Sequence, residues 1–195
     1  MAGVPSFPQC LTAQTKAGTL FNTYTTAKSV INPEDLVTLP ANYDKVGTRF
    51  QIKAAGALSN IVTTPGTVTF QVMMGTNASP IVAWTSGAIQ LNATAHTLLP
   101  FKLELTLRQD STGNGTNAKF IGLGYLNGIQ FTNTAAQTDA VNTTGMFPVP
   151  ATAPAVGTGF DSTTANILDF WAGFSISNAG NGIQIYDYEV LQYIF

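Results

Sequence analysis

Apolar and polar residues alternate along most of the chain from Val46 onward, which is the pattern of β-strands with one buried face and one exposed face. The clearest strand begins at Pro100 and places four apolar residues on one side and four polar residues on the other. The apolar residues are Phe101, Leu103, Leu105 and Leu107, and the polar residues are Lys102, Glu104, Thr106 and Arg108. We expect the first set in the core and the second set in water.

Other segments show the same period of two between turn-forming residues. Glycines at positions 56, 122 and 124 indicate a bend or a close approach of two backbones. The phase of the last strand changes near Tyr186-Asp187, which predicts a β-bulge. The expected strands cover residues 50–55, 67–74, 81–85, 100–108, 120–131, 166–175 and 182–195, and the segment 110–117 has the composition of a hairpin loop.

Two segments lack this alternation. Residues 1–47 contain Pro5, Pro8, Pro33 and Pro40, and we expect them to form an extended N-terminal arm that leads into the core. Within this arm we expect one short strand at 20–26 and one helical turn at 33–36 that starts with proline. Residues 132–165 are rich in Thr, Ala, Gly and Pro and form a long excursion, a type of segment that is often functional. We therefore divide the chain into an arm, 1–47, and a sandwich domain, 48–195.

About eight strands without alternating helices predict an all-β antiparallel sandwich or barrel and exclude α/β folds. The length of 195 residues fits one such domain. At this size roughly 70% of the surface of the unfolded chain is buried on folding, so a core needs neither a disulfide nor a metal.

The composition changes what we expect of the surface. Charged residues make up 9% of the chain, against about 25% in typical globular domains. A surface of Thr, Ser, Asn and Gln favours contact with another protein, although a neutral soluble β-sandwich fits the composition equally well. The chain has no run of about 20 apolar residues, so we expect no membrane helix. The net charge of −2, with scattered Lys and Arg, gives no basic patch for nucleic acid.

Residues that carry chemistry are scarce. His96 is the one histidine and Cys10 the one cysteine, which rules out zinc sites of the usual His and Cys ligands and internal disulfides. We interpret His96 as an ordinary surface residue in a loop, because no nucleophile motif accompanies it. A calcium site in the 110–117 loop is disfavoured, because its acids are too few and too loosely spaced. We expect no catalytic residues, no metal and no cofactor.

A glycosidase or a sugar-binding surface needs other features. No pair of carboxylates among Glu34, Glu104 and Glu189 and the nearby Asp residues is singled out by the sequence. Trp84 and Trp171 are candidates for a sugar platform, but both lie inside apolar strand patterns, which favours a place in the core. The first residues have no basic start and no apolar stretch of a signal peptide, so we expect synthesis in a host cytoplasm without export.

One stretch is more specific. Residues 38–59 read TLPANYDKVGTRFQIKAAGALS, and TPGTVTFQV follows at 64–72. Together with LPFKLELTL at 99–107 and AGNGIQI at 179–185, they resemble a group of small proteins encoded among the structural genes of tailed bacteriophages. The resemblance covers most of 19–131 and 166–195. It implies a jelly-roll-like sandwich located in the virion, either on the capsid exterior or in a tail or head fibre, and it brings no catalytic residues.

From the pattern and the resemblance together we expect a capsid decoration or cement protein. Its partner would be the major capsid protein of the same virus, bound where capsomers meet, and the chain would form a homotrimer. Residues 1–30 and 132–165 are the expected contact segments, because they hold apolar residues outside the regular strands. The candidate contacts are Phe7, Leu11, Phe21, Met146 and Phe147. The alternative is a fibre domain that recognises host glycans, with Trp84 or Trp171 exposed in a groove.

Overall fold

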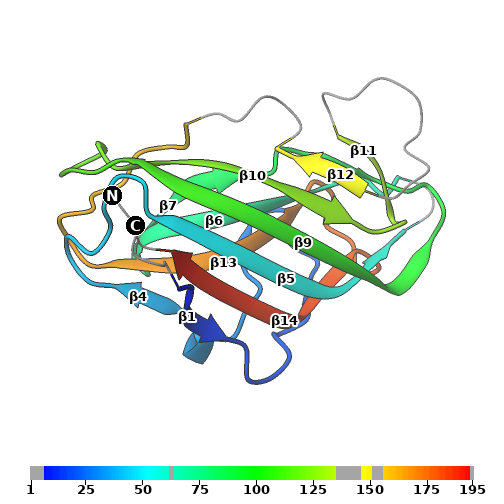
Figure 1. Cartoon of the computed structure of the whole chain (residues 1–195). Helices are drawn as coiled ribbons and strands as arrows, with labels where there is room; N and C mark the ends of the chain where they lie inside the picture. Colours follow the sequence, from blue (N-terminus) through cyan, green and yellow to red (C-terminus); the bar gives the residue numbers. More distant parts are fainter. Residues whose placement is uncertain (1–6, 62–63, 135–145, 151–155, 194–195) are drawn as a thin grey trace.

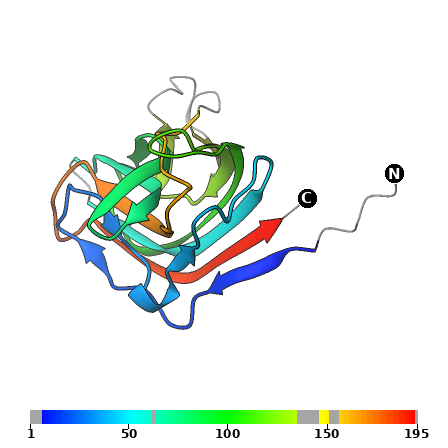
Figure 2. The same ribbon diagram turned by 90° about the vertical axis from the view of Figure 1, so that its left-hand side faces the viewer.

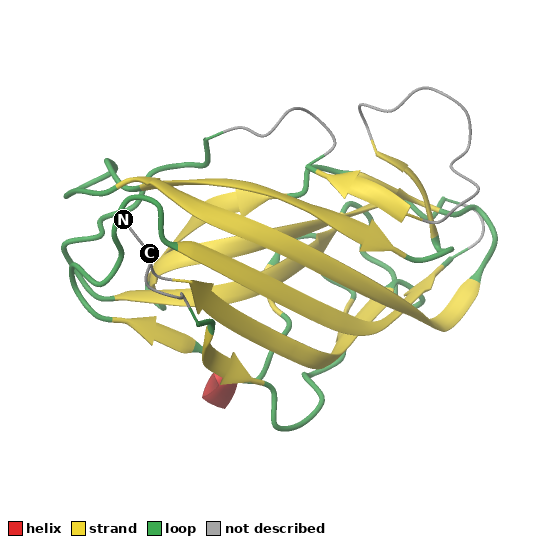
Figure 3. Ribbon diagram, in the orientation of Figure 1, coloured by secondary structure: helices red, strands yellow, loops and turns green. Residues whose placement is uncertain are grey.

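A computed structural model describes residues 7–61, 64–134, 146–150 and 156–193. The chain forms an all-β sandwich of two antiparallel seven-stranded sheets (Figures 1 and 3). Sheet A has the order β1 (Gln9–Ala13), β14 (Gly182–Tyr193), β5 (Arg49–Asn60), β9 (His96–Ser111), β10 (Lys119–Asn127) and β12 (Met146–Val149), with β2 (Phe21–Asn22) beside β14. Sheet B has the order β11 (Phe131–Thr134), β8 (Ile89–Leu91), β6 (Thr67–Thr76), β13 (Asn166–Phe174) and β3 (Lys28–Ser29), with β4 (Val37–Leu39) beside β13 and β7 (Ser79–Thr85) beside β6.

The first long strand pairs with the last one, and the second long strand pairs with the one before the last. β5 pairs with β14 in sheet A, while the next long strand, β6, pairs with the preceding strand, β13, in sheet B. The two consecutive strand pairs therefore lie in opposite sheets, which is the arrangement of a jelly-roll-like sandwich. β9 and β10 form an ordinary hairpin beside β5. The predicted all-β sandwich is confirmed.

The alternation in β9 is confirmed residue by residue. Its four apolar side chains are at most 3% exposed, and the four polar ones face solvent. The strand begins at His96 rather than Pro100, because residues 96–100 continue the pairing with β5. One predicted strand, 120–131, is wrong. It is two strands in different sheets, β10 and β11, separated by a turn in which the Phe131 amide donates to the Gly128 carbonyl.

A cluster of aromatic rings joins the two sheets. The Phe70 ring of β6 lies 5.8 Å from the Phe170 ring of β13 and 5.7 Å from the Phe101 ring of β9, measured between centroids. Phe131 of β11 adds an edge-to-face contact with Phe70 at 6.5 Å. All four side chains are essentially buried. Such pairs stabilise the fold beyond the area they bury.

The described part of the segment 1–47 does not stand away from the sandwich. Its strands β1 and β2 pair with β14, and β3 and β4 pair with β13, so the segment joins both sheets. The helical turn expected near Pro33 is present as a 3-10 turn at Pro33–Asp35. Buried residues of this segment belong to the common core: Phe21, Val30, Ile31, Val37 and Leu39. In Figure 2, β1 lies at the border of sheet A. No helix in the described ranges is long and apolar enough to span a bilayer.

The excursion 132–165 is also part of the sandwich where it is described. β12 pairs with β10, and single bridges join Ala118 to Phe160 and Ile121 to Val156. Val149 and Phe160 are buried. The long structureless segment expected from the sequence is therefore wrong for these residues, because short strands of four residues show no recognisable period.

The bulge predicted near Tyr186-Asp187 is present. Ile185 pairs with Gly56 and Asp187 with Ala55, so Tyr186 is the extra residue. A Cβ atom at Gly56 would lie 2.3 Å from the Gln184 carbonyl oxygen. The glycine therefore permits the close approach of β5 to the bulged strand.

Asp44 makes stability depend on pH. Burial raises the pKa of its carboxyl from 3.8 to about 6, and its Oδ1 has no hydrogen-bond partner within the described chain. A raised carboxyl pKa means that the folded state binds the proton more tightly, so stability falls as pH rises from about 4 to about 7. The difference between the two pKa values corresponds to a loss of at most about 3 kcal/mol in the free energy of unfolding.

We therefore expect Asp44→Asn to increase the free energy of unfolding at pH 7 and to flatten its pH dependence between pH 4 and 7. Urea denaturation at pH 4, 5.5 and 7 measures both effects. The exposed Asp187→Asn is the control and should leave the slope unchanged. An unaltered slope for the Asp44 variant would contradict the assignment.

Candidate binding face

The outer face of sheet A is built from four long strands that pair side by side. Side chains cross it in four rows, each in the order β14, β5, β9 and β10, because directly paired residues point to the same side of a sheet. The rows are Tyr193, Arg49, Arg108 and Ile121; Leu191, Gln51, Thr106 and Leu123; Glu189, Lys53, Glu104 and Tyr125; and Asp187, Ala55, Lys102 and Asn127. β12 extends the last two rows with Pro148 and Met146.

Charge is arranged differently in the first and third rows. In the third row Lys53 lies between two glutamates, and its Nζ is 3.1 Å from the Glu189 Oε2. The hydrogen bond to Glu189, more than the nearby charges, raises the pKa of Lys53. In the first row Arg49 faces Arg108. The Arg108 Nη2 is 3.0 Å from Asp110 Oδ1, and both side chains are partly exposed. These surface pairs contribute little to stability.

Apolar side chains gather at the β10–β12 border of this face. Leu123 is 50% exposed, Tyr125 55%, Met146 50% and Val156 46%, and Pro148 is also exposed. We call these five residues the apolar edge. The β10–β12 pairing brings Tyr125, Pro148 and Met146 together. Leu123 lies two residues before Tyr125 on the same face of β10, and Val156 joins through its bridge to Ile121. Pro148 has no amide hydrogen to donate, so β12 is poorly suited to adding another strand.

The inward side of β10 explains why Leu123 and Tyr125 face outward. A Cβ atom at Gly122 would lie 2.4 Å from Leu107 Cδ2 and 2.6 Å from Trp84 Cδ1. The Cα of Gly122 thus faces the packed interior with no room for a side chain. Because successive residues of a strand point to opposite faces, Leu123 and Tyr125 point to solvent. The glycines at 122 and 124 were a signal in the sequence for this outcome.

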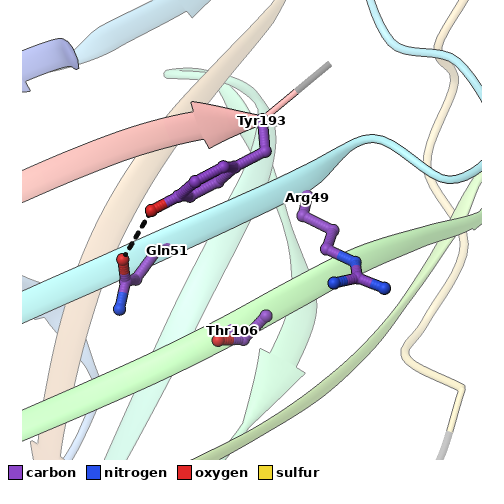
Figure 4. Close-up of a pocket in the computed structure, with 4 residues that line it drawn as sticks. All are labelled: Arg49, Gln51, Thr106 and Tyr193. Atoms are coloured by element: carbon purple, nitrogen blue, oxygen red, sulfur yellow. Dashed lines mark hydrogen bonds between the residues drawn. The ribbon is translucent and has the colours of Figure 1, made fainter. Parts of the chain in front are cut away.

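Two hollows open on the outer face. One has a volume of about 200 Å³ and is lined by Arg49, Gln51, Thr106 and Tyr193 (Figure 4). The Tyr193 hydroxyl donates to Gln51 Oε1 at 3.2 Å. The second, of about 360 Å³, lies toward the other end of β5 and β9 and is lined by Ala55, Gly56, Pro100, Phe101, Lys102, Asn127 and Tyr186. Both combine an aromatic side chain with polar groups.

The five contact residues expected from the sequence are not brought together. Phe7 is 79% exposed and Met146 is 50% exposed, while Leu11 is partly buried against the core. Phe21 is 5% exposed and stacks on Phe174, and Phe147 is fully buried against Phe131. The last two are corrected from surface to core residues, because both lie on inward positions of short strands.

The tryptophans behave differently from each other. Trp84 is buried as expected, and its Nε1 donates to the Gly122 carbonyl at 3.3 Å. Trp171 is only half-buried on the outer side of sheet B, where its Nε1 donates to Asp169 Oδ2 at 2.6 Å. Asp169 also accepts hydrogen bonds from Ser29 Oγ and its neighbour's amide. Burial raises the pKa of Asp169 even though these donors oppose the shift. Trp171 thus hydrogen-bonds a buried carboxylate and does not present its ring as an exposed surface for a sugar.

The residues considered for catalysis and metal binding lie apart. His96 is anchored rather than loose in a loop, because its Nδ1 is 3.1 Å from Asn60 Oδ1. In the 110–117 loop, Asn117 donates to Asn114 and Ser111 donates to the Asn117 carbonyl. No group of three or more His, Cys, Asp or Glu side chains that could hold a metal occurs in the described part of the chain.

These features define the class of the molecule as a β-sandwich whose outer sheet face carries an apolar edge and two hollows. No protein-family model matches the chain, and no curated protein sequence matches it. Among solved structures it is similar to the CBM2 module of the evolved Dit of Lactobacillus casei BL23 phage J-1, with 12% identity and a TM-score of 0.36. The alignment covers 97% of this chain and 98% of that chain.

Proposed function

We propose that the chain is a non-enzymatic virion protein of a tailed phage that binds the assembled capsid as a decoration or cement protein. The partner is the major capsid protein, and binding stabilises the contacts between capsomers. The apolar edge is the observation that carries this proposal. The sequence resemblance to proteins encoded among phage structural genes supports the location in the virion.

The apolar edge has the composition of an interface core. Interfaces between proteins are enriched in aromatic residues and Met at their centre and depleted of charge. Tyr125 and Met146 are of the enriched types, and none of the five residues of the apolar edge is charged. Each 100 Å² of apolar area that is removed from water contributes about 2.5 kcal/mol before the cost of association. The expected partner surface is therefore apolar and weakly charged.

A homotrimer would strengthen such binding without a larger patch. Three linked copies engage neighbouring sites on the shell as one unit, and the second and third contacts then form at high effective concentration. A weak contact per copy is sufficient in that arrangement. The mass of the free protein in solution, measured by light scattering, tests the trimer.

The test of capsid binding is a double variant of the apolar edge, Leu123→Ser with Tyr125→Ser. Both side chains are half-exposed, so the change should leave folding intact while capsid binding weakens at least tenfold. Co-sedimentation with purified capsids measures the binding. The control is Val46→Ser, which removes an apolar side chain that is 64% exposed outside the apolar edge. Equal binding by the double variant would contradict the proposal.

The two hollows favour a second candidate, a tail or head fibre domain that recognises host surface glycans. Sugar-binding sites combine an aromatic face with hydrogen-bonding groups, and Tyr193 and Tyr186 lie at such positions. Measuring glycan binding and capsid binding on the same protein distinguishes the two functions. A glycan array that binds the chain, together with no capsid binding, favours the fibre, and the reverse result favours the decoration protein.

A further inference from the structure

Asparagine is followed by glycine at three places in the chain, at Asn114, Asn127 and Asn181. In such a pair the backbone nitrogen of the glycine can attack the side-chain carbonyl carbon of the asparagine, because glycine has no side chain to obstruct the approach and leaves its backbone free to turn. The attack closes a succinimide ring, and the asparagine loses its amide nitrogen as ammonia. The structure places the three pairs in different surroundings.

Two of the pairs are held away from this reaction. Asn181 is fully buried, and both ends of its side-chain amide bond the backbone of neighbouring segments. Asn127 is exposed, but it is the last residue of β10 and pairs with β9 on one side and with β12 on the other. Pairing on both sides keeps the backbone extended, so the nitrogen that follows Asn127 does not turn back toward its side chain.

The third pair is open to the reaction. Asn114 lies in the exposed 110–117 loop, and a Cβ atom at Gly115 would meet nothing within 4 Å. The Asn117 Nδ2 donates a hydrogen bond to Asn114 Oδ1 at 3.3 Å. Such a donor draws electrons from the carbonyl carbon that the Gly115 nitrogen attacks, and it stabilises the negative charge that develops on the oxygen.

A carboxylate lies beside the attacking nitrogen. Gly113 and Ser162 exchange hydrogen bonds, at 2.9 Å and 3.0 Å between the atoms, and so hold the segment around Asp161 against the loop. The Thr163 hydroxyl first, and the Gly115 amide next, lower the pKa of the Asp161 carboxyl. The carboxylate is therefore ionised at neutral pH, next to the N–H group that must lose its proton, which is the position of a general base.

We propose that Asn114 is a self-modification site, converted to aspartate or isoaspartate through a succinimide, with Asp161 as the base and Asn117 as the donor to the carbonyl oxygen. The Gly115 nitrogen forms a bond to Asn114 Cγ and gives its proton to Asp161. The bond between Cγ and the side-chain nitrogen breaks, and that nitrogen takes the proton and leaves as ammonia. Water then adds to one of the two ring carbonyls and opens the ring.

This inference goes beyond binding to a capsid or a glycan, because the chain itself changes. A neutral amide is replaced by a carboxylate close to Asp161, and the isoaspartate product has one more carbon in its backbone. The two like charges repel each other, so the contact between the 110–117 loop and the segment around Asp161 weakens as the reaction proceeds.

The test is incubation of the full chain at neutral and mildly alkaline pH, followed by mass spectrometry. Trypsin cleaves after Arg108 and Lys119, so Asn114 is released in a peptide, 109–119, that contains neither of the other two pairs. We expect this peptide to lose ammonia and then to gain the mass of the acid, while Asn127 and Asn181 keep their amides. The folded chain should convert Asn114 faster than the same chain in urea, where Asp161 and Asn117 no longer contact the pair.

Variants test the roles of the two neighbours. Asp161→Asn and Asn117→Ala should each slow the conversion at least tenfold, and Asp161→Glu should retain most of the rate because it keeps a carboxylate. The control is Asp110→Asn, which removes another carboxylate of the loop and should leave the rate unchanged. The proposal is overturned if Asn114 keeps its amide, if it converts no faster in the folded chain than in urea, or if the Asp161→Asn variant reacts as fast as the unaltered chain.

Discussion

Replacing Phe70 with alanine is expected to lower the free energy of unfolding by about 3–5 kcal/mol. The Phe70 side chain is fully buried and contacts the rings of Phe101, Phe131 and Phe170. Because Phe101 belongs to sheet A and the other rings to sheet B, the alanine leaves a cavity at the place where the sheets meet. Tightly packed neighbours collapse only partly into such a cavity.

Equilibrium unfolding in urea, followed by tryptophan fluorescence, measures this loss. The matched control is Tyr125→Ala, which removes an aromatic side chain that is 55% exposed and should change stability by about 0.5 kcal/mol or less. If the Phe70 and Tyr125 variants unfolded at the same urea concentration, the central position of Phe70 would be refuted.

Gly124→Ala is expected to destabilise the fold by about 3 kcal/mol, at the upper end of the cost of overpacking. The added Cβ would lie 2.0 Å from the Glu104 carbonyl oxygen and 2.8 Å from the Leu105 Cα. Both atoms belong to the backbone of the paired strand β9, which cannot rotate away as a side chain can. The β9–β10 hairpin must separate locally, and its hydrogen bonds are strained or lost.

The control for this variant is another strand glycine, Gly182→Ala. Its added Cβ would meet nothing closer than Leu20 Cδ1 at 3.5 Å, an ordinary contact. Since alanine restricts the unfolded chain more than glycine does, this variant should be neutral or slightly more stable. Thermal unfolding of both variants provides the comparison, and a Gly124 variant as stable as the Gly182 variant would count against the close approach of β9 and β10.

The long strands were predictable because each buries one face along many residues. In β9 four consecutive apolar positions repeat at a period of two, and the structure buries all four. The bulge at Tyr186 was also predictable, because it shifts the phase of a long strand. The short strands β1, β3, β4 and β12 show no such signal, since two to five residues cannot display a period. The strand predicted at 20–26 is present only as the two residues of β2. The sequence therefore predicts an extended arm at 1–47 and an excursion at 132–165 where the described residues form short strands of the sandwich.

The candidate site was predictable only in part. Met146 and Phe7 were expected on the surface and are exposed, whereas Phe21 and Phe147 are core residues. The apolar edge depends on β12 pairing with β10, a contact between residues that a long stretch of chain separates. The hollow of Arg49 and Tyr193 combines three strands, β5, β9 and β14, and nothing in the local sequence of any one of them indicates it.

The sequence by itself determined the fold class and the inward face of each long strand, because burial of alternate residues is a local property of the chain. It also determined the weakly charged surface and the scarcity of chemical groups. Only the tertiary structure decided which outward faces lie side by side. Strand order and register place Arg49 opposite Arg108 and bring Tyr125 next to Pro148. Those contacts form between distant segments, so the packing of the whole domain fixes them.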